Sequence, residues 1–339
     1  MIIKSKAYPR AALIGNPSDG YFGKTIAFVF RNYCAEVELY ETPELELLPT
    51  ERDGTVFNSI EHLVSDVGQF GYYGGIRLLK ATVKKFYEFC RKHSITLDER
   101  NFTIRYQTDI PNRLGMAGSS AIITAALRAL VRFFGIQISC PVFANLVLSV
   151  EKEELGIQAG LQDRVAQAYN EPVFMDFNYD HMTRYGYGIY TPIEIPQDLN
   201  LYIAYRTDLA EGSEILHSRL RDDYNKGNPE VLAAIREWAQ LTEYVAECLR
   251  ERKYRHLSSY INRNFDLRCE VCRDSVSPKN RNMVEIARKA GASAKFTGSG
   301  GAIIGTYEGE EMYRKLQEKL KEFSVEVIKP DIVTGGGAQ

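Results

Sequence analysis

The stretch IPNRLGMAGSSAIITAALRALVRFFG, residues 110–135, decides the fold because it joins a glycine loop to a helix. A strand is predicted to end at Pro111, and a loop with two glycines leads into Ser119-Ser120. Apolar residues then recur at helical spacing until Gly135, a typical helix-ending residue. Such a loop directs free N–H groups, the positive helix end and two hydroxyl groups to one place. These residues suit a phosphate with Mg²⁺, and they suit a capped structural helix equally well.

The composition is that of a globular protein acting on small molecules. The chain has 339 residues, which favours two domains, and 42 basic and 44 acidic residues give a net charge of −2. This balance argues against nucleic-acid and membrane-surface partners. No run approaches the ~18 apolar residues of a membrane span. The first residues lack the apolar segment of a secretory signal, so a cytoplasmic location is expected.

The cysteines give little support for a metal or redox site. Four of the six cysteines are isolated in the sequence, and the other two, Cys269 and Cys272, form one C-x-x-C. A second pair, or two histidines at zinc-finger spacing, does not accompany it. Reduced, structural thiols are therefore expected.

A second glycine stretch imitates a nucleotide-binding loop. The sequence SDGYFGKT, residues 18–25, ends like a Walker A motif, but Ser18 replaces its first glycine. The following residues are β-branched and aromatic and predict a strand, whereas a true P-loop opens a helix. The phosphate-binding loop is therefore expected elsewhere.

Strands and helices are mixed without strict alternation, which predicts the α+β class. The stretch 178–199 is rich in Tyr, Gly and Pro and lacks a long period, so it is the best boundary candidate. We place the domains at 1–190 and 191–339. Outside the first forty residues, which read as three strands around a glycine turn, the predicted strands are 102–106, 173–177, 200–206, 302–307 and 325–328. The predicted helices are two within 59–93, then 119–134, 141–154, 160–169, 228–250, 255–272, 281–290 and 309–323.

Three motifs resemble the signatures of the GHMP kinases, the family of galactokinase, homoserine, mevalonate and phosphomevalonate kinases. PNRLGMAGSSA (111–121) resembles the family's phosphate loop, with Met116 in the usual leucine position. YPRAALIGNPSD (8–19) resembles its N-terminal motif, and KFTGSGGAIIG (295–305) its C-terminal motif. The resemblance implies an N-terminal domain like domain 2 of ribosomal protein S5, a C-terminal ferredoxin-like domain and an active site between them. It also implies that residues 16–23 form a sugar-side loop.

Within the family, the chain looks most like the glucuronokinase branch, which phosphorylates the anomeric hydroxyl of D-glucuronate with ATP. GNPSD, EKEELGIQAGLQDRVAQAY and FMDF carry this likeness, and Asn16-Pro17 replaces the Glu-His of galactokinases. The resemblance implies ATP and Mg²⁺ as cofactors and a sugar acid as the small-molecule partner. A monomer or a homodimer is expected.

The resemblance also assigns roles to individual residues. Asp163 is implied as the catalytic base and Arg10 as the cation beside it. Glu151 is implied as a Mg²⁺ ligand together with Ser119 or Ser120. The residues implied to bind the ATP phosphates are Gly115, Ala117, Gly118, Ser119, Ser120 and Ala121. The residues implied to bind the substrate are Asn16, Asp19, Gly298 and Gly300.

The sequence leaves several alternatives open for the function and for the roles of single residues. A kinase of the same fold could act on galactose or a heptose phosphate, and a sugar and ATP sensor without catalysis could share the fold. A decarboxylase of the mevalonate branch is disfavoured by Asp19. Tyr72 and Tyr73 could flank the nucleotide base or be core residues, and Arg113 or Arg206 could meet a substrate carboxylate.

Overall fold

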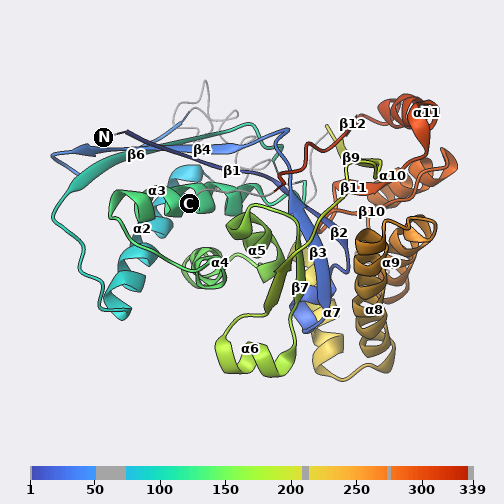
Figure 1. Ribbon diagram of the computed structural model, residues 1–339, viewed down its shortest axis with the longest axis horizontal. Helices are drawn as coiled ribbons and strands as arrows, with labels where there is room; N and C mark the ends of the chain where they lie inside the picture. Colours follow the sequence, from blue (N-terminus) through green and yellow to red (C-terminus); the bar gives the residue numbers. More distant parts are fainter. Residues whose placement is uncertain (1, 51–73, 113, 208–213, 273–275, 335–339) are drawn as a thin grey trace, which may run out of the picture.

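The computed structural model describes residues 2–50, 74–112, 114–207, 214–272 and 276–334, and of residues 214–219 only the backbone. Within these ranges the strands form three four-stranded sheets covered by helices (Figure 1). The α+β class predicted from the sequence is confirmed.

The first sheet is antiparallel except for one short edge strand. Alternate residues of its strand β4 are buried, as expected for a sheet with one covered face. Helix α3 (Gly118–Phe133) packs on that face, and α2 (Gly75–Lys92) packs beside α3 (Figure 1). In order across the sheet the strands are β1 (Ile2–Ala7), β4 (Ala35–Thr42), β6 (Asn101–Thr108) and β5 (Glu46–Leu48).

The second sheet is antiparallel and occupies the middle of the molecule. Its two first strands are buried along almost their whole length because several helices contact them. The strands, in order, are β2 (Arg10–Ile14), β3 (Lys24–Val29), β7 (Val173–Asp176) and β8 (Ile189–Pro192). The helical elements of this part are η1 (Ser18–Tyr21), α4 (Cys140–Ser149), the π-helical turn η3 (Val150–Glu154), α5 (Leu161–Tyr169) and α6 (Tyr179–Tyr185).

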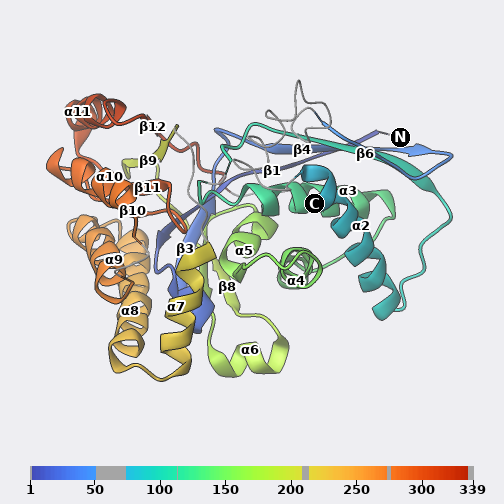
Figure 2. The same ribbon diagram turned by 180° about the vertical axis from the view of Figure 1, so that it is seen from behind.

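The third sheet is antiparallel and is built from the C-terminal half of the chain. Its strands, in order, are β10 (Lys295–Phe296), β11 (Ala302–Thr306), β9 (Leu201–Arg206) and β12 (Val325–Ile328). The helices are α7 (Glu214–Asn225), α8 (Pro229–Glu251), α9 (Leu257–Val271), α10 (Pro278–Lys289) and α11 (Gly309–Lys321). Figure 2 shows α7 alongside α8, which it contacts.

One apolar core joins the second and third sheets. It combines residues of β2 and β3 with residues of β9, β11, α8 and α9. Trp238 of α8 is fully buried, and its indole N–H donates to the carbonyl oxygen of Asn264 at 3.0 Å. The Asn264 side chain accepts from Gly15 N at 2.7 Å and donates to Asn16 O at 2.9 Å. Helix α9 therefore fixes the turn that follows β2.

Most long periodic elements lie close to their predicted positions, whereas α7 and several short elements were not predicted. The stretch 178–199 contains α6 and the strand β8, which pairs with β7. Asn178 caps α6 by accepting from His181 N at 3.1 Å, and the helix is too short to show a period. A boundary near residue 190 stays a prediction. The first helix predicted within 59–93 and the residues Tyr72, Tyr73 and Arg113 lie outside the described residues.

Candidate active site

The N-terminus of α3 is open to an anion. The helix begins at Gly118, and the preceding Ala117 has left-handed backbone angles (φ 62°) and provides no side-chain cap. The first helical bond that closes this turn runs from Ala121 N to Ala117 O at 3.1 Å. The N–H of Ala121 is therefore occupied, whereas those of Gly118, Ser119 and Ser120 have no partner within the helix. Together with the helix dipole, three such N–H groups suit a phosphate.

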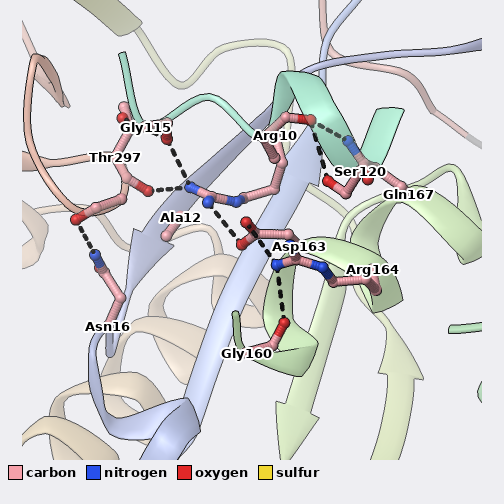
Figure 3. A network of polar contacts seen from close by, with 12 residues as sticks. Arg10, Ala12, Asn16, Gly115, Ser120, Gly160, Asp163, Arg164, Gln167 and Thr297 are labelled. Atoms are coloured by element: carbon pink, nitrogen blue, oxygen red, sulfur yellow. Dashed lines mark hydrogen bonds and ion pairs between the residues drawn. The ribbon is translucent and has the colours of Figure 1, made fainter. Parts of the chain in front are cut away.

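The two serines of this turn have different surroundings. The Ser119 hydroxyl donates to Glu151 Oε1 at 2.6 Å. The Ser120 hydroxyl is buried and donates to Ala117 O at 3.1 Å, and Gln167 Nε2 donates to the same carbonyl at 3.0 Å (Figure 3). The structure thus brings Ser119 and Glu151 together and turns Ser120 into the loop.

Glu151 is fully buried in the π-helical turn that continues α4. Arg164 Nε donates to its Oε2 at 2.6 Å, and Arg164 Nη2 contacts the same oxygen. Arg164 Nη1 also lies 3.1 Å from Asp163 Oδ2 and donates to Gly160 O at 2.9 Å. One guanidinium therefore bridges the carboxylates of Glu151 and Asp163.

Arg10 connects three segments that are far apart in the sequence. Its Nη2 lies 2.6 Å from Asp163 Oδ1 at the start of α5. Its Nη1 donates to Gly115 O at 3.3 Å and to the carbonyl oxygen of Thr297 (Figure 3). The side chain is almost completely buried, and its Nε has no partner among the described residues. Arg10 thus places the phosphate loop, the C-terminal glycine loop and Asp163 around one cation.

These two arginines keep Asp163 ionised. Burial raises the pKa of the Asp163 carboxyl group, but the charges of Arg10 and Arg164 outweigh burial and hold it below its usual value. Asp163 is therefore a carboxylate at neutral pH. It can orient a hydroxyl group by accepting its hydrogen bond.

The phosphate loop and the C-terminal glycine loop touch through their backbones. Gly115 has φ +65°, and a Cβ atom there would lie 2.8 Å from Gly300 O. A Cβ atom on Gly298 would lie 2.5 Å from Gly115 O. Both distances are shorter than any side chain tolerates, so these positions require glycine for the close approach.

Asp19 lies on η1, against the start of α5. A Cβ atom on Gly160 would lie 2.6 Å from Asp19 Oδ2. Burial and the negative charge of Asp163 raise the pKa of Asp19 to about 6, although Arg10 and Arg164 oppose this shift. The structure therefore brings Asp19 and Asp163, both predicted from the sequence, to the same place.

Asn16 is turned into the protein. Its side-chain amide donates to Phe296 O and Gly298 O, both at 3.3 Å, and accepts from Lys295 Nζ at 2.6 Å. Asn16 is buried, and these bonds hold the turn after β2 against the C-terminal glycine loop. Its side chain therefore supports the site from behind.

Two buried cations escaped the sequence reasoning. Arg164 directly follows Asp163 in the sequence, but its ion pair with Glu151 joins two separate helical elements. Spacing along one helix predicts contacts only between residues three or four apart, so it could not predict this ion pair. Lys295 is the first residue of the C-terminal motif, but no role was predicted for it from the sequence. Its Nζ donates to Ala12 O at 2.7 Å and Phe296 O at 2.8 Å in addition to Asn16. Burial and the charges of Arg268 and Arg10 lower the pKa of Lys295 well below its usual value.

The Walker-like stretch leads into a strand, as predicted, and not into a helix. Lys24 is the first residue of β3, and its Nζ lies 3.1 Å from Asp176 Oδ2 and 2.5 Å from Glu243 Oε1. The lysine is therefore neutralised by two acids of the chain and does not face the open end of α3.

Other kinds of site find no support in the described parts of the chain. None of their helices combines the length and the apolar character of a membrane span. No three His, Cys, Asp or Glu side chains there come together as a metal-binding group, and the cysteines form no disulfide.

Comparisons with known proteins identify the family of the chain. Residues 77–171 match the N-terminal domain of the GHMP kinases, and residues 245–322 match their C-terminal domain. The chain is 40% identical over 336 residues to probable glucuronokinase 2 of Arabidopsis thaliana, covering 97% of this chain and 91% of the relative. It is 38% identical over 334 residues to glucuronokinase 1 of the same organism, covering 96% and 92%.

Solved structures share the fold. A Lactococcus lactis galactokinase complexed with galactose superimposes with a TM-score of 0.77 at 14% identity, covering 98% of this chain and 94% of that one. A Streptococcus pneumoniae phosphomevalonate kinase gives 0.77 at 12% identity, covering 98% and 100%. From the two matched domains and the relatives that align over nearly its whole length, the chain belongs to the GHMP kinase family.

Proposed function

We propose that this protein transfers the γ-phosphoryl group of ATP to the anomeric hydroxyl of D-glucuronate, giving glucuronate 1-phosphate and ADP. The observation that carries the proposal is the ion pair between the buried Arg10 and the half-buried Asp163, which adjoins both the phosphate loop and Asp19. The near full-length similarity to two glucuronokinases supports this substrate.

The geometry matches the demands of phosphoryl transfer, which needs positioning and charge stabilisation more than covalent chemistry. The open N–H groups of α3 would hold the phosphates of ATP. Asp19 would accept hydrogen bonds from sugar hydroxyls, and Asp163 would orient the anomeric hydroxyl. Because Arg10 and Arg164 lower the pKa of Asp163, it would accept the proton late, as the new bond forms. Arg10 would also stabilise negative charge on the transferring group.

Mg²⁺ fits the donor set of this site. Ser119 Oγ and Glu151 Oε1 lie 2.6 Å apart, and both are hard oxygen donors of the kind Mg²⁺ prefers. Bound there, the ion would neutralise charge on the ATP phosphates. Ser120 is the weaker candidate because its hydroxyl is engaged by Ala117 O.

A panel assay tests the proposal. ADP release would be measured with D-glucuronate, D-galacturonate, D-glucose and D-galactose, with Asp163→Asn protein at the same concentration as the control for contaminating kinases. We expect glucuronate to be preferred by at least ~100-fold in kcat/KM, because a site built for a charged group leaves that group unpaired with a neutral sugar. NMR of the product should place the phosphate on the anomeric oxygen. Comparable turnover of galactose would make this a kinase of another sugar.

A sensor without catalysis is the second candidate. It predicts ATP binding without ADP release from any sugar, and the intact set of Arg10, Glu151 and Asp163 argues against it. The domain boundary near residue 190, a cytoplasmic location and a monomeric or dimeric state complete the proposal and need their own measurements.

A further inference from the structure

An arginine without a carboxylate partner lies against the turn that carries Asp19. Arg221 of α7 forms no ion pair with any residue the structure describes, and its guanidinium carbon lies 4.6 Å from the centre of the Tyr21 ring. A Cβ atom on Gly20 would lie 3.3 Å from Arg221 Nη2. Because Asp19, Gly20 and Tyr21 belong to the same turn, η1, the guanidinium lies against the turn that carries Asp19.

The position of Arg221 is fixed by its neighbours on α7. Leu220 is buried in the core, and the ring of Tyr224 lies 5.1 Å from that of Tyr21, measured between ring centres. Tyr21 itself is buried. The part of α7 that carries Arg221 is therefore anchored in the core, and the exposed guanidinium lies over the packed Tyr21 ring, which reduces the entropy that a ligand must overcome on binding.

A second unpaired cation lies behind this turn. Arg268 of α9 is 2% exposed and forms no ion pair within the described ranges. Its Nη1 donates to Gly298 O at 2.8 Å and its Nη2 to Ser299 O at 3.0 Å, while Nε has no partner there. Carbonyl oxygens solvate this charge but do not neutralise it.

The charges around the turn therefore do not balance. Arg10 and Arg164 are paired with Asp163 and Glu151, whereas neither Arg221 nor Arg268 forms an ion pair within the described residues, and Asp19 is the acid whose charge acts on Arg268. Asp222 and Asp223, the neighbouring acids on α7, have no ion pair with Arg221 in the described structure. An anion bound beside Asp19 would complete the pairing.

We propose that Arg221 binds the carboxylate of a uronic acid substrate, and that Arg268 adds buried positive charge behind it. This inference rests on the proposed function. The planar guanidinium matches a carboxylate with two parallel hydrogen bonds, which a neutral hydroxymethyl group cannot reproduce. Of the arginines considered from the sequence, Arg206 is not free, and Arg113 lies outside the described residues.

The test compares D-glucuronate with D-glucose, which differ only in carrying a carboxylate or a hydroxymethyl group at C5. In the full-length protein, Arg221→Gln should lower kcat/KM for glucuronate about 10- to 100-fold, as expected for losing a hydrogen-bonded charge. The loss should appear in the KM for glucuronate, with kcat and the KM for ATP within about 3-fold of wild type. Arg221→Lys should keep part of the preference, and Arg221→Glu should abolish it. Arg236→Gln, on the exposed face of α8, is the matched control.

The outcomes separate the two proposals. If wild-type protein does not phosphorylate glucuronate, the proposed function fails. If wild-type protein prefers glucuronate and Arg221→Gln keeps that preference, the function stands and the role of Arg221 is wrong. A rise in the KM for ATP with an unchanged KM for glucuronate would assign Arg221 to the nucleotide and would also overturn the inference.

Discussion

The guanidinium of Arg10 and the carboxylate of Asp163 lie 2.6 Å apart, with the arginine side chain almost completely buried and that of Asp163 18% exposed, although they come from strand β2 and helix α5. The same guanidinium contacts carbonyl oxygens of the phosphate loop and of the C-terminal glycine loop. A shift of either loop would therefore move a cation that holds Asp163 ionised.

Ionisation of Asp19 should produce an acid limb in the pH profile of kcat/KM and should lower the free energy of unfolding. Its pKa is about 6 in the native state and 3.8 without the protein environment, so native protein binds this proton more tightly than unfolded protein does. The free energy of unfolding therefore falls as pH rises through this interval. Ionised Asp19 is needed to accept sugar hydroxyls, so kcat/KM for the sugar should fall below about pH 6.

The variant Asp19→Asn separates these two effects. It should raise the melting temperature at pH 8 more than at pH 4, while lowering kcat/KM for the sugar and removing the acid limb near pH 6. Melting curves and pH–rate profiles provide the measurements. A melting temperature that falls equally at both pH values would show that Asp19 is not destabilised by its surroundings.

Gly115→Ala should raise the KM for ATP by more than backbone strain alone explains. Gly115 and Gly135 both have φ +65°, but an added Cβ meets Gly300 O at 2.8 Å at the first position and nothing within 4 Å at the second. Gly135→Ala therefore serves as the control for strain and should cost about 1 kcal/mol with an unchanged KM for ATP. Gly115→Ala should raise the KM for ATP about 10- to 100-fold because the loop is displaced. Equal ATP constants in the two variants would argue against the packing of these loops.

The serines should differ in their response to Mg²⁺. The Ser119 hydroxyl meets Glu151, whereas that of Ser120 bonds Ala117 O. Ser119→Ala and Glu151→Gln should raise the Mg²⁺ concentration needed for half-maximal activity, with activity partly restored at high Mg²⁺. Ser120→Ala should lower thermal stability and leave the Mg²⁺ titration unchanged. If only Ser120→Ala shifted the Mg²⁺ titration, Ser120 and not Ser119 would be the Mg²⁺ ligand.

Lys24→Ala tests the Walker-like stretch. Lys24 begins a strand and is paired with Asp176 and Glu243, so its removal should leave the ATP dissociation constant within about 2-fold of wild type. Equilibrium binding of a fluorescent ATP analogue to folded protein is the measurement. Loss of ATP binding would show that the Walker-like stretch binds the phosphates.

The sequence predicts the long elements and the motif residues well because their signals are local. The periodicity of residues 119–134 locates α3, and the motif resemblances point to Arg10, Asp19 and Asp163, which the fold brings together. Arg164 could not be found in this way. Its ion pair with Glu151 depends on the π-helical turn that positions the glutamate, and the spacing of residues in the sequence does not predict such a turn.

Burial of polar residues was equally hidden from the sequence. Asn16 occupies a motif position that suggests a sugar contact, but its amide is used by Lys295 and by two carbonyl groups. Those partners come from a segment nearly three hundred residues away in a 339-residue chain. Such partners become visible only once the third sheet is folded against β2.

The activity of Asp163→Asn shows whether this carboxylate acts on the sugar hydroxyl. The substitution preserves size but removes the charge that pairs with Arg10 and the basicity needed to accept the anomeric proton. With saturating ATP and D-glucuronate, the account predicts that kcat falls about 100-fold or more, while the ATP dissociation constant and the Mg²⁺ titration stay near wild type. A kcat within about 3-fold of wild type in a folded variant would contradict the assignment of Asp163 and with it the proposed mechanism.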